Sequence, residues 1–421
     1  MKIKATFLGG AGEVGKSSIM ISDNKINIML DYGVKLQEEP VEYPILPREK
    51  IDVVIPSHAH LDHSGAVPIL FKRGEPKVIA TDLTLELSYL LLNDSLKISK
   101  KRRERLPFSK RDLKSMMRNS TPIRYRTPKK IGGIKIELFD AGHIPGSASI
   151  LMSKEKKIFY TGDIKMKDSR LLNGCSLPDK TDVLIIESTY GDKKQPKRED
   201  EEKKLKRYVR EALTNNDIAL IPTFAVGRAQ EILLVLEEFA DFIAIDGMAK
   251  QATEIIYYYK RYIKNSEKLK KIMKRITWIR NMRQRKNIIR KGGIVLTTAG
   301  MLGGGPIIFY LQELHDNPKT KILFSGFLVE DTPGYNLLKT GVYSNEEMVG
   351  EKNNFKVKCE MHRLDFSAHA DREELLNIIK KLSPKKVICV HGDNPKKFAK
   401  DVEEIFNIDA FAPKIGEEIV L

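Results

Sequence analysis

Short apolar runs rich in Val and Ile dominate the first 190 residues, and most of them are closed by Gly, Asp or His. Runs of this length and β-branched content favour strands over helices. They occupy residues 2–10, 25–31, 51–56, 134–140, 157–163 and 182–188. The pattern predicts a layered α/β domain in this part of the chain.

Beyond residue 190, charged segments with helical character alternate with apolar runs. The helical segments are residues 206–215 and 228–242, and the apolar runs are residues 217–225, 293–300 and 320–326. This βα alternation is typical of a parallel sheet covered by helices, so it predicts a second α/β domain.

The last stretch of the chain returns to the pattern of the first domain. A helical segment at 374–382 precedes a strand-like run at 385–391. We therefore expect the second domain, residues 191–364, to be inserted into the first. Residues 1–190 and 365–421 would then form one domain.

Basic charge is abundant and unevenly placed. The 421 residues include 73 Lys or Arg against 56 Asp or Glu, a net charge of +17 that suits a partner such as nucleic acid. Residues 260–291 hold fourteen basic residues against the single acid Glu267, with Trp278 inside the segment and Tyr258 just before it. A second basic segment covers residues 97–111. These segments predict an RNA-binding surface, and the alternative is a solvated helical surface with core aromatics.

Several classes of protein are excluded. The N-terminus lacks the apolar core of a signal peptide, and no run approaches the roughly 18 apolar residues of a membrane span, so we expect a cytoplasmic protein. The three cysteines are widely spaced without a CxxC pair, which excludes a disulfide scaffold and a thiolate zinc site. Any metal must therefore be held by His and carboxylates.

Residues 10–17 match the phosphate-loop pattern GxxxxGK[ST], which raises the possibility of an ATPase. A phosphate loop leads into a helix, whereas the residues that follow Ser17 resemble two strands joined by a turn. We expect a tight glycine turn with Lys16 at the surface.

The sequence His58-Ala-His60-Leu-Asp62-His63 directly follows a predicted strand. An HxH pair in extended chain points both rings to one side, and a helix starting near Asp62 directs two further ligands to a second point nearby. More ligand-type residues lie at the ends of other strand-like runs, at one expected sheet edge. These are Asp31, His143, Asp163, Glu187 and His391. The pattern predicts a site for two adjacent metal ions.

These motifs resemble those of the metallo-β-lactamase nucleases that carry an inserted β-CASP domain. The matching elements are HAHLDH with Asp31, His143 and Asp163, then Glu187 in ESTYGD, His369 in SAHAD and His391 in VHGD. FAVGRAQEILL at 224–234 is similar to the RNA-cleaving subunit of the cleavage and polyadenylation specificity factor and its archaeal homologues, more than to ribonuclease J. The resemblance implies an α/β fold, an αββα sandwich with an inserted parallel-sheet domain.

The same resemblance implies roles for the site residues. It assigns His58, His60 and His143 to one zinc ion, Asp62, His63 and His391 to a second, and Asp163 to the bridge between them. Asp31 would orient a ligand histidine. His369 would act as general acid or phosphate clamp, with Glu187 bonded to its other ring nitrogen.

The function implied is a zinc-dependent ribonuclease with two Zn²⁺ per chain, in which a bridging hydroxide attacks RNA phosphodiester bonds, as an endonuclease, a 5′–3′ exonuclease or both. Candidate RNA contacts are Arg228, Thr298, Gly300, Lys271 and Lys274. The chain departs from the family pattern at Phe327, Asp331 and Tyr335. We expect no KH module before Met1, so that RNA selectivity would come from this chain or from partners.

Two alternatives remain open from the sequence. One is a catalytically inactive RNA-binding scaffold, and the other is a small-molecule metallo-hydrolase acting on thioesters or lactams. The complete ligand set disfavours the first, and the inserted domain with its basic segment disfavours the second. The chain would work as a monomer or a homodimer.

Overall fold

The computed structural model describes residues 3–23, 25–36, 40–345 and 354–421. The chain forms two compact units, of which the first comprises Met1–Lys194 and Ala368–Leu421 and the second Gln195–Ser367. The boundaries expected from the sequence were 190/191 and 364/365. No helix among the described residues is long and apolar enough to cross a membrane.

The first unit is built on two seven-stranded sheets. In order, the first sheet contains β22 (Glu418–Val420), β1 (Lys4–Gly9), β2 (Ser18–Ser22), β3 (Asn27–Leu30), β4 (Val53–Ile55), β5 (Lys77–Ala80) and β6 (Ser120–Pro122). The second contains β21 (Asp409–Phe411), β20 (Lys386–Val390), β11 (Val183–Glu187), β10 (Lys157–Tyr160), β9 (Ala148–Ser153), β8 (Ile134–Asp140) and β7 (Lys129–Ile131). The C-terminal segment therefore contributes strands to both sheets.

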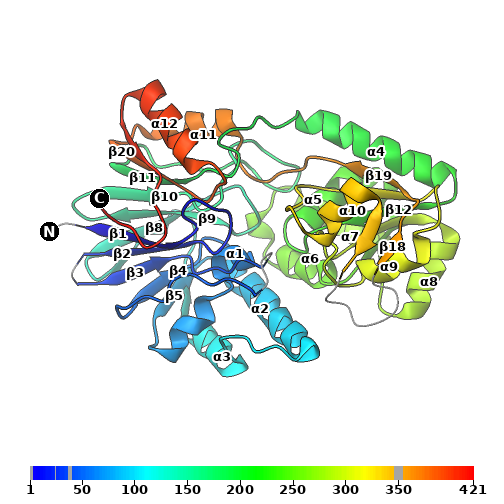
Figure 1. The fold of residues 1–421 in the computed structure, drawn as a ribbon, viewed down its shortest axis with the longest axis horizontal. Helices are drawn as coiled ribbons and strands as arrows, with labels where there is room; N and C mark the ends of the chain where they lie inside the picture. The colour runs from blue at the N-terminus through cyan, green and yellow to red at the C-terminus, as the bar shows by residue number, and fades with distance from the viewer. Residues whose placement is uncertain (1–2, 24, 37–39, 346–353) are drawn as a thin grey trace. The chain divides into compact units, whose positions relative to one another are not determined.

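Alternation along the strands explains the layering. In β10, Ile158 and Tyr160 point into the core between the two sheets, while Phe159 points to the helices outside. Helices α2 (Asp82–Arg102) and α3 (Lys110–Arg118) pack on the first sheet, and α11 (Arg372–Leu382) and α12 (Pro395–Phe406) pack on the second (Figure 1). Because each strand has two apolar faces, both sheets need a helical cover. The predicted αββα sandwich is confirmed.

The second unit contains a parallel sheet in the order β14 (Thr277–Trp278), β13 (Ile243–Asp246), β15 (Gly293–Thr297), β12 (Ile218–Pro222), β16 (Lys321–Phe324) and β19 (Glu360–Arg363). Its helices are α4 (Arg198–Thr214), α5 (Arg228–Val235), α6 (Ala249–Tyr258), α7 (Ser266–Arg275), α8 (Met282–Lys291), α9 (Ile307–Leu314) and α10 (Pro333–Thr340). A hairpin of β17 (Val342–Ser344) and β18 (Asn354–Lys356) is attached. The predicted βα alternation is thus confirmed.

The glycine-rich stretch 10–17 forms a turn that leads into β2 and not into a helix, as expected. The predicted surface position of Lys16 is wrong, because its side chain is buried and forms ion pairs with Glu13 and Glu42. At the start of this turn, a Cβ on Gly9 would lie 2.0 Å from the backbone oxygen of Lys16. Gly9 is therefore required by close backbone approach.

Replacing Gly9 by alanine should destabilise the first unit by roughly 1–3 kcal/mol, the usual cost of overpacking. The backbone of Lys16 must move to admit the methyl group. Thermal unfolding should show the apparent melting temperature of Gly9→Ala lowered by a few degrees. Gly74→Ala is the control, because its added Cβ would meet only the flexible Lys50 side chain at 4.0 Å. Equal melting temperatures would contradict this interpretation of Gly9.

Candidate metal centre

The HAHLDH segment bends after β4 and then begins a helix. The chain leaves β4 after Ile55 and reaches His60, which is extended and precedes the short helix α1 (Leu61–Ser64). The amides of His63 and Ser64 both donate to the His60 carbonyl. Because the helix begins at Leu61, the side chains of Asp62 and His63 point to a different place from those of His58 and His60.

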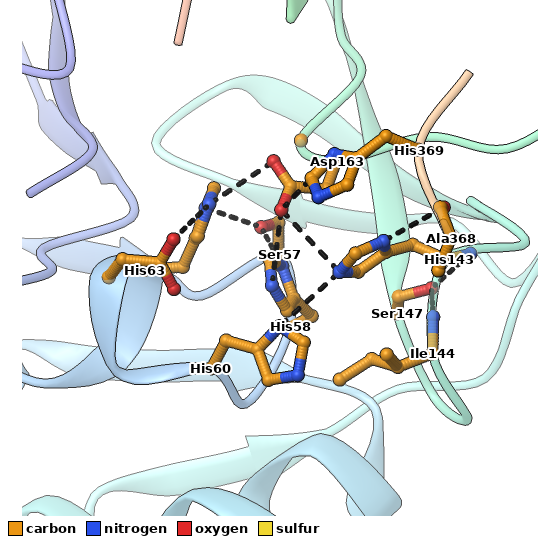
Figure 2. A network of polar contacts seen from close by, with 12 residues as sticks. Ser57, His58, His60, His63, His143, Ile144, Ser147, Asp163, Ala368 and His369 are labelled. Carbon is orange, nitrogen blue, oxygen red and sulfur yellow. Dashed lines mark hydrogen bonds and ion pairs between the residues drawn. The ribbon is translucent and has the colours of Figure 1, made fainter. Parts of the chain in front are cut away.

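The first ligand group consists of His58, His60, His143 and Asp163, whose ligand-type atoms lie within 4.8 Å of one another. The Nε2 atoms of His58 and His143 each lie 3.5 Å from Oδ2 of Asp163. These side chains point toward a common point, as Figure 2 shows.

The second group consists of Asp62, His63, Asp163 and His391. Oδ1 of Asp163 lies 3.2 Å from Nε2 of His63 and 3.5 Å from Nδ1 of His391. Nε2 of His391 lies 3.6 Å from Oδ2 of Asp62. Asp163 therefore presents one carboxylate oxygen to each group, the arrangement that a shared ligand requires.

Asp31 lies behind this second group and is fully buried. Its Oδ2 is 2.8 Å from Nδ1 of His63 and accepts hydrogen bonds from the hydroxyls of Ser57 at 2.9 Å and Tyr160 at 2.6 Å. With Nδ1–H of His63 donating to Asp31, the Nε2 lone pair of His63 is directed at Asp163 and the cluster. Asp31 is thus in contact with the ring nitrogen of His63 that faces away from the cluster.

The donor set fits a metal ion. Nε2 of His58, His63 and His391 and Oδ1 of Asp163 are buried and face other ligand-type atoms without a well-aligned hydrogen bond, an arrangement that is costly unless a cation is bound. Burial lowers the pKa of His58 and His143 well below the usual range, so their rings are neutral and can act as ligands.

The carboxylates make the cluster attractive to cations. Burial would raise the pKa of Asp163, but the adjacent His63, His391 and His369 outweigh it and hold that pKa well below its usual range. Likewise, burial opposes protonation of His63, yet Asp163 and Asp31 raise its pKa. The site therefore holds concentrated negative charge away from water, which a proton or a metal ion can neutralise.

A third group joins His369 and Glu187 to Asp163. Nδ1 of His369 lies 3.0 Å from Oε2 of Glu187 and 4.0 Å from Oδ2 of Asp163. Burial alone would lower the pKa of His369, but the negative charges of Glu187 and Asp163 raise it to about 9. The protonated form of His369 is thereby stabilised, which suits a proton donor or a phosphate contact.

The five candidate RNA contacts lie in the second unit. Arg228 begins α5 after β12, while Thr298 and Gly300 follow β15, so these three share the carboxyl edge of one parallel sheet. A Cβ on Gly300 would lie 3.2 Å from the backbone of Thr223, so the two loops touch. Lys271 and Lys274 are exposed on α7.

Burial removes one aromatic residue of the basic segment 260–291 as a base-stacking platform and restricts another. Tyr262 is buried, and Trp278 is half-buried with its indole N–H bonded to the Met273 carbonyl at 3.0 Å. Tyr258, in contrast, is 79 % exposed. Of these three, Tyr258 is the ring that can stack on a base.

Several supporting residues could not be found in the sequence. Ser57 and Tyr160 hold Asp31, and the Thr189 hydroxyl lies 3.2 Å from Nδ1 of His391. Ser57 had a weak signal, since it directly precedes HAHLDH. Nothing in the sequence indicated that Tyr160 and Asp31, 129 positions apart, would meet.

Comparison with protein-family profiles gives three matches. The Beta-Casp domain matches residues 229–337, the Zn-dependent metallo-hydrolase RNA specificity domain matches residues 354–413, and the anti-Pycsar protein Apyc1 matches residues 8–204. These regions cover both units of the chain.

Curated relatives match almost the whole chain. The "Probable RNase MJ4" of Methanocaldococcus jannaschii is 42 % identical over 98 % of this chain and 99 % of its own length. "RNase aCSPSF2" of Saccharolobus solfataricus is 33 % identical over 98 % and 84 %. The "Transcription termination factor FttA" of M. jannaschii is 34 % identical over 98 % and 70 %.

Among solved structures, a protein of unknown function from Enterococcus faecalis V583 matches 100 % of both chains with a TM-score of 0.61 and 16 % identity. At this level of identity the likeness concerns the fold alone.

Proposed function

Since the chain belongs to the β-CASP family of metallo-β-lactamase-fold ribonucleases, we propose that it hydrolyses RNA phosphodiester bonds with two zinc ions, in RNA processing or decay. We expect this activity in the cytoplasm. The observation that carries the proposal is the position of Asp163, with one oxygen toward each of two ligand groups.

The proposed ligands are His58, His60 and His143 for one ion and Asp62, His63 and His391 for the other, with Asp163 shared. An imidazole-rich set with carboxylates and no thiolate suits zinc. Two such ions, when bound, supply a nucleophile from water at neutral pH and neutralise charge on the phosphate. The chain itself holds the ligands: Asp31 fixes the ring of His63, and Thr189 contacts that of His391.

His369 acts as the proton donor in this proposal. Glu187 engages Nδ1 of His369, so the proton on Nε2 passes to the oxygen that leaves phosphorus when the P–O bond breaks. Glu187 also accepts the backbone amide of Ile164 at 2.7 Å, which ties its position to the Asp163 loop. The acid is thus held in fixed relation to the shared ligand.

RNA binding is assigned to the second unit. Helix α7 buries Leu269 and Ile272 on one side and exposes Lys270, Lys271 and Lys274 on the other. Other cations of this segment are already paired, such as Arg275 with Asp241 at 2.6 Å. The exposed lysines therefore offer the charge that can follow an RNA backbone.

An inactive scaffold is disfavoured by this geometry. A protein that only binds RNA has no need to keep unpartnered, buried imidazole nitrogens on His58, His63 and His391.

Metal analysis tests the shared ligand. Purified protein should carry close to two zinc equivalents per chain, and Asp163→Ala should lower both zinc content and RNA cleavage because one carboxylate serves two ions. Asp179→Ala, at an exposed aspartate, is the control and should retain both. Full zinc content in Asp163→Ala would refute the bridging assignment.

Three variants separate the acid from the ligands. His369→Ala should keep both metals and near-normal RNA affinity while its cleavage rate falls by roughly 10²–10⁴. His391→Ala should lose or loosen one zinc. Glu187→Gln should be a milder version of His369→Ala, since the ring stays but its orientation weakens.

Zinc content is measured beside single-turnover rates for these three variants. If His369→Ala loses a zinc while His391→Ala keeps both, the two histidines have exchanged roles and the assigned mechanism is wrong.

The RNA surface is tested by salt dependence. Log K for RNA should fall with log salt, and converting Lys270, Lys271 and Lys274 to Gln should flatten the slope by up to about 2, at about 0.7 per lost phosphate contact on single strands. The matched control converts exposed Lys396, Lys397 and Lys400 on α12 to Gln, with the same change in net charge. Equal slopes for the two triple variants would show that α7 is only solvated.

A further inference from the structure

A buried ion pair joins the two loops that carry Asp163 and His369. Nζ of Lys165 lies 2.9 Å from Oε2 of Glu374, and only 8 % and 2 % of the two side chains are exposed. Lys165 follows Asp163 by two residues, and Glu374 lies in the first turn of α11, five residues after His369. Neither Lys165 nor Glu374 is one of the proposed metal ligands or the proposed acid.

The same lysine reaches the backbone of His369. Nζ of Lys165 donates to the His369 carbonyl oxygen at 2.9 Å, and the next amide, that of Ala370, donates to the Ile164 carbonyl at 2.6 Å. The peptide that carries the imidazole is therefore held by residues 164 and 165. Residues 164 and 165 directly follow Asp163 in the same loop.

Glu374 completes the connection from the other side. Its Oε1 accepts the amides of Met166 at 3.1 Å and Lys167 at 2.7 Å, while its Oε2 accepts the amide of Asp371 at 3.2 Å. Asp371 in turn caps α11 by accepting the Glu374 amide at 3.0 Å. One carboxylate thus binds both loops.

A buried ion pair is a poor means of stabilising a fold, because apolar residues of similar size do as well or better. It can, however, tie several groups together, since one ammonium has three donors. Here one donor reaches Glu374 and another reaches the His369 carbonyl.

We propose that Lys165, held by Glu374, is a positioning residue that fixes the His369 imidazole relative to Asp163 and Glu187 for proton transfer. The inference rests on the proposed role of His369 as general acid. In that step an oxygen from water forms a new bond to phosphorus while the P–O bond to the leaving oxygen breaks. The electron pair of the broken bond goes to the leaving oxygen, which takes the proton from Nε2 of His369. When the Lys165 contact is lost, the imidazole ring is still present but no longer held in this alignment.

A sulfur substitution at the leaving position isolates the proton step. When sulfur replaces the leaving oxygen, the electron pair goes to a thiolate, which departs without a proton because thiols are far more acidic than alcohols. The assay uses two RNAs that differ only in this atom, with single-turnover rates, RNA affinity and zinc content measured for each variant.

Lys165→Met should retain zinc and RNA affinity and lose at least about tenfold in rate on the oxygen substrate, within the range of a misplaced acid. On the sulfur substrate its rate should lie within about twofold of the unsubstituted protein. Added to His369→Ala, it should cause no further loss, since the two act through one step. A slow rate on both substrates, or loss of zinc, overturns the proposal.

A second variant protects the test against misfolding. Lys165→Met leaves the buried Glu374 with only the exposed Lys167, whose Nζ is 3.9 Å away, as counterion. Lys165→Met with Glu374→Gln removes the buried charge and keeps a side-chain oxygen for the amides of Met166 and Lys167. The double variant still lacks the donor to the His369 carbonyl, so the same dependence on the leaving atom is expected. If it cleaves the oxygen substrate at the normal rate, Lys165 has no positioning role.

Lys321→Met is the matched control. Lys321 is also a buried lysine, 5 % exposed and paired with Glu211 and Glu360, but it lies in the second unit. It should change the ratio of oxygen to sulfur rates by less than about twofold.

His369→Ala, run in parallel, tells the two possible failures apart. If sulfur does not restore its rate, the acid assignment itself fails. If sulfur restores His369→Ala but not Lys165→Met, only the inference about Lys165 fails.

Discussion

A buried carboxylate surrounded by imidazoles is the constraint on which this structure depends. Asp163 is 2 % exposed and lies within 3.5 Å of four histidine rings. Such a charge is tolerated away from water only where positive charge compensates it, and His63 and His369, whose pKa values are raised, lie beside it. The two sheets deliver these neighbours: His58 and His63 follow β4 of one sheet, whereas Asp163 and His391 follow β10 and β20 of the other.

Two residues of this cluster adopt backbone conformations that residues other than glycine rarely take. Asp31 and His391 have φ values of +56° and +48°. Strain of this kind persists where surrounding contacts over-determine a residue. For Asp31 those contacts are the hydrogen bonds from Ser57 and Tyr160. The backbone strain therefore lies at the residue that contacts the ring of His63.

The candidate ligands could be predicted from the sequence because metal chemistry restricts residue type and strand ends restrict position. HAHLDH, Asp163 and His391 all follow strands that can be recognised locally, so their position can be predicted from the sequence without knowledge of the fold. Contacts made across the sandwich leave no such trace. Lys165 and Glu374 are 209 positions apart, and nothing local marks either. Lys16 was misplaced for the same reason, since its partner Glu42 comes from a separate loop.

The participation of the C-terminal segment in both sheets has a consequence for synthesis on the ribosome. Strands β20 and β21 extend one sheet, β22 pairs with β1 in the other, and His369 and His391 belong to the same late segment. A chain emerging from the N-terminus has His58, His60, His143 and Asp163 early, and the second unit can fold as a body of its own meanwhile. His391, the remaining proposed ligand, and His369, the proposed acid, arrive only with residues 368–421. The proposed site can therefore be complete only after this late segment has been synthesised.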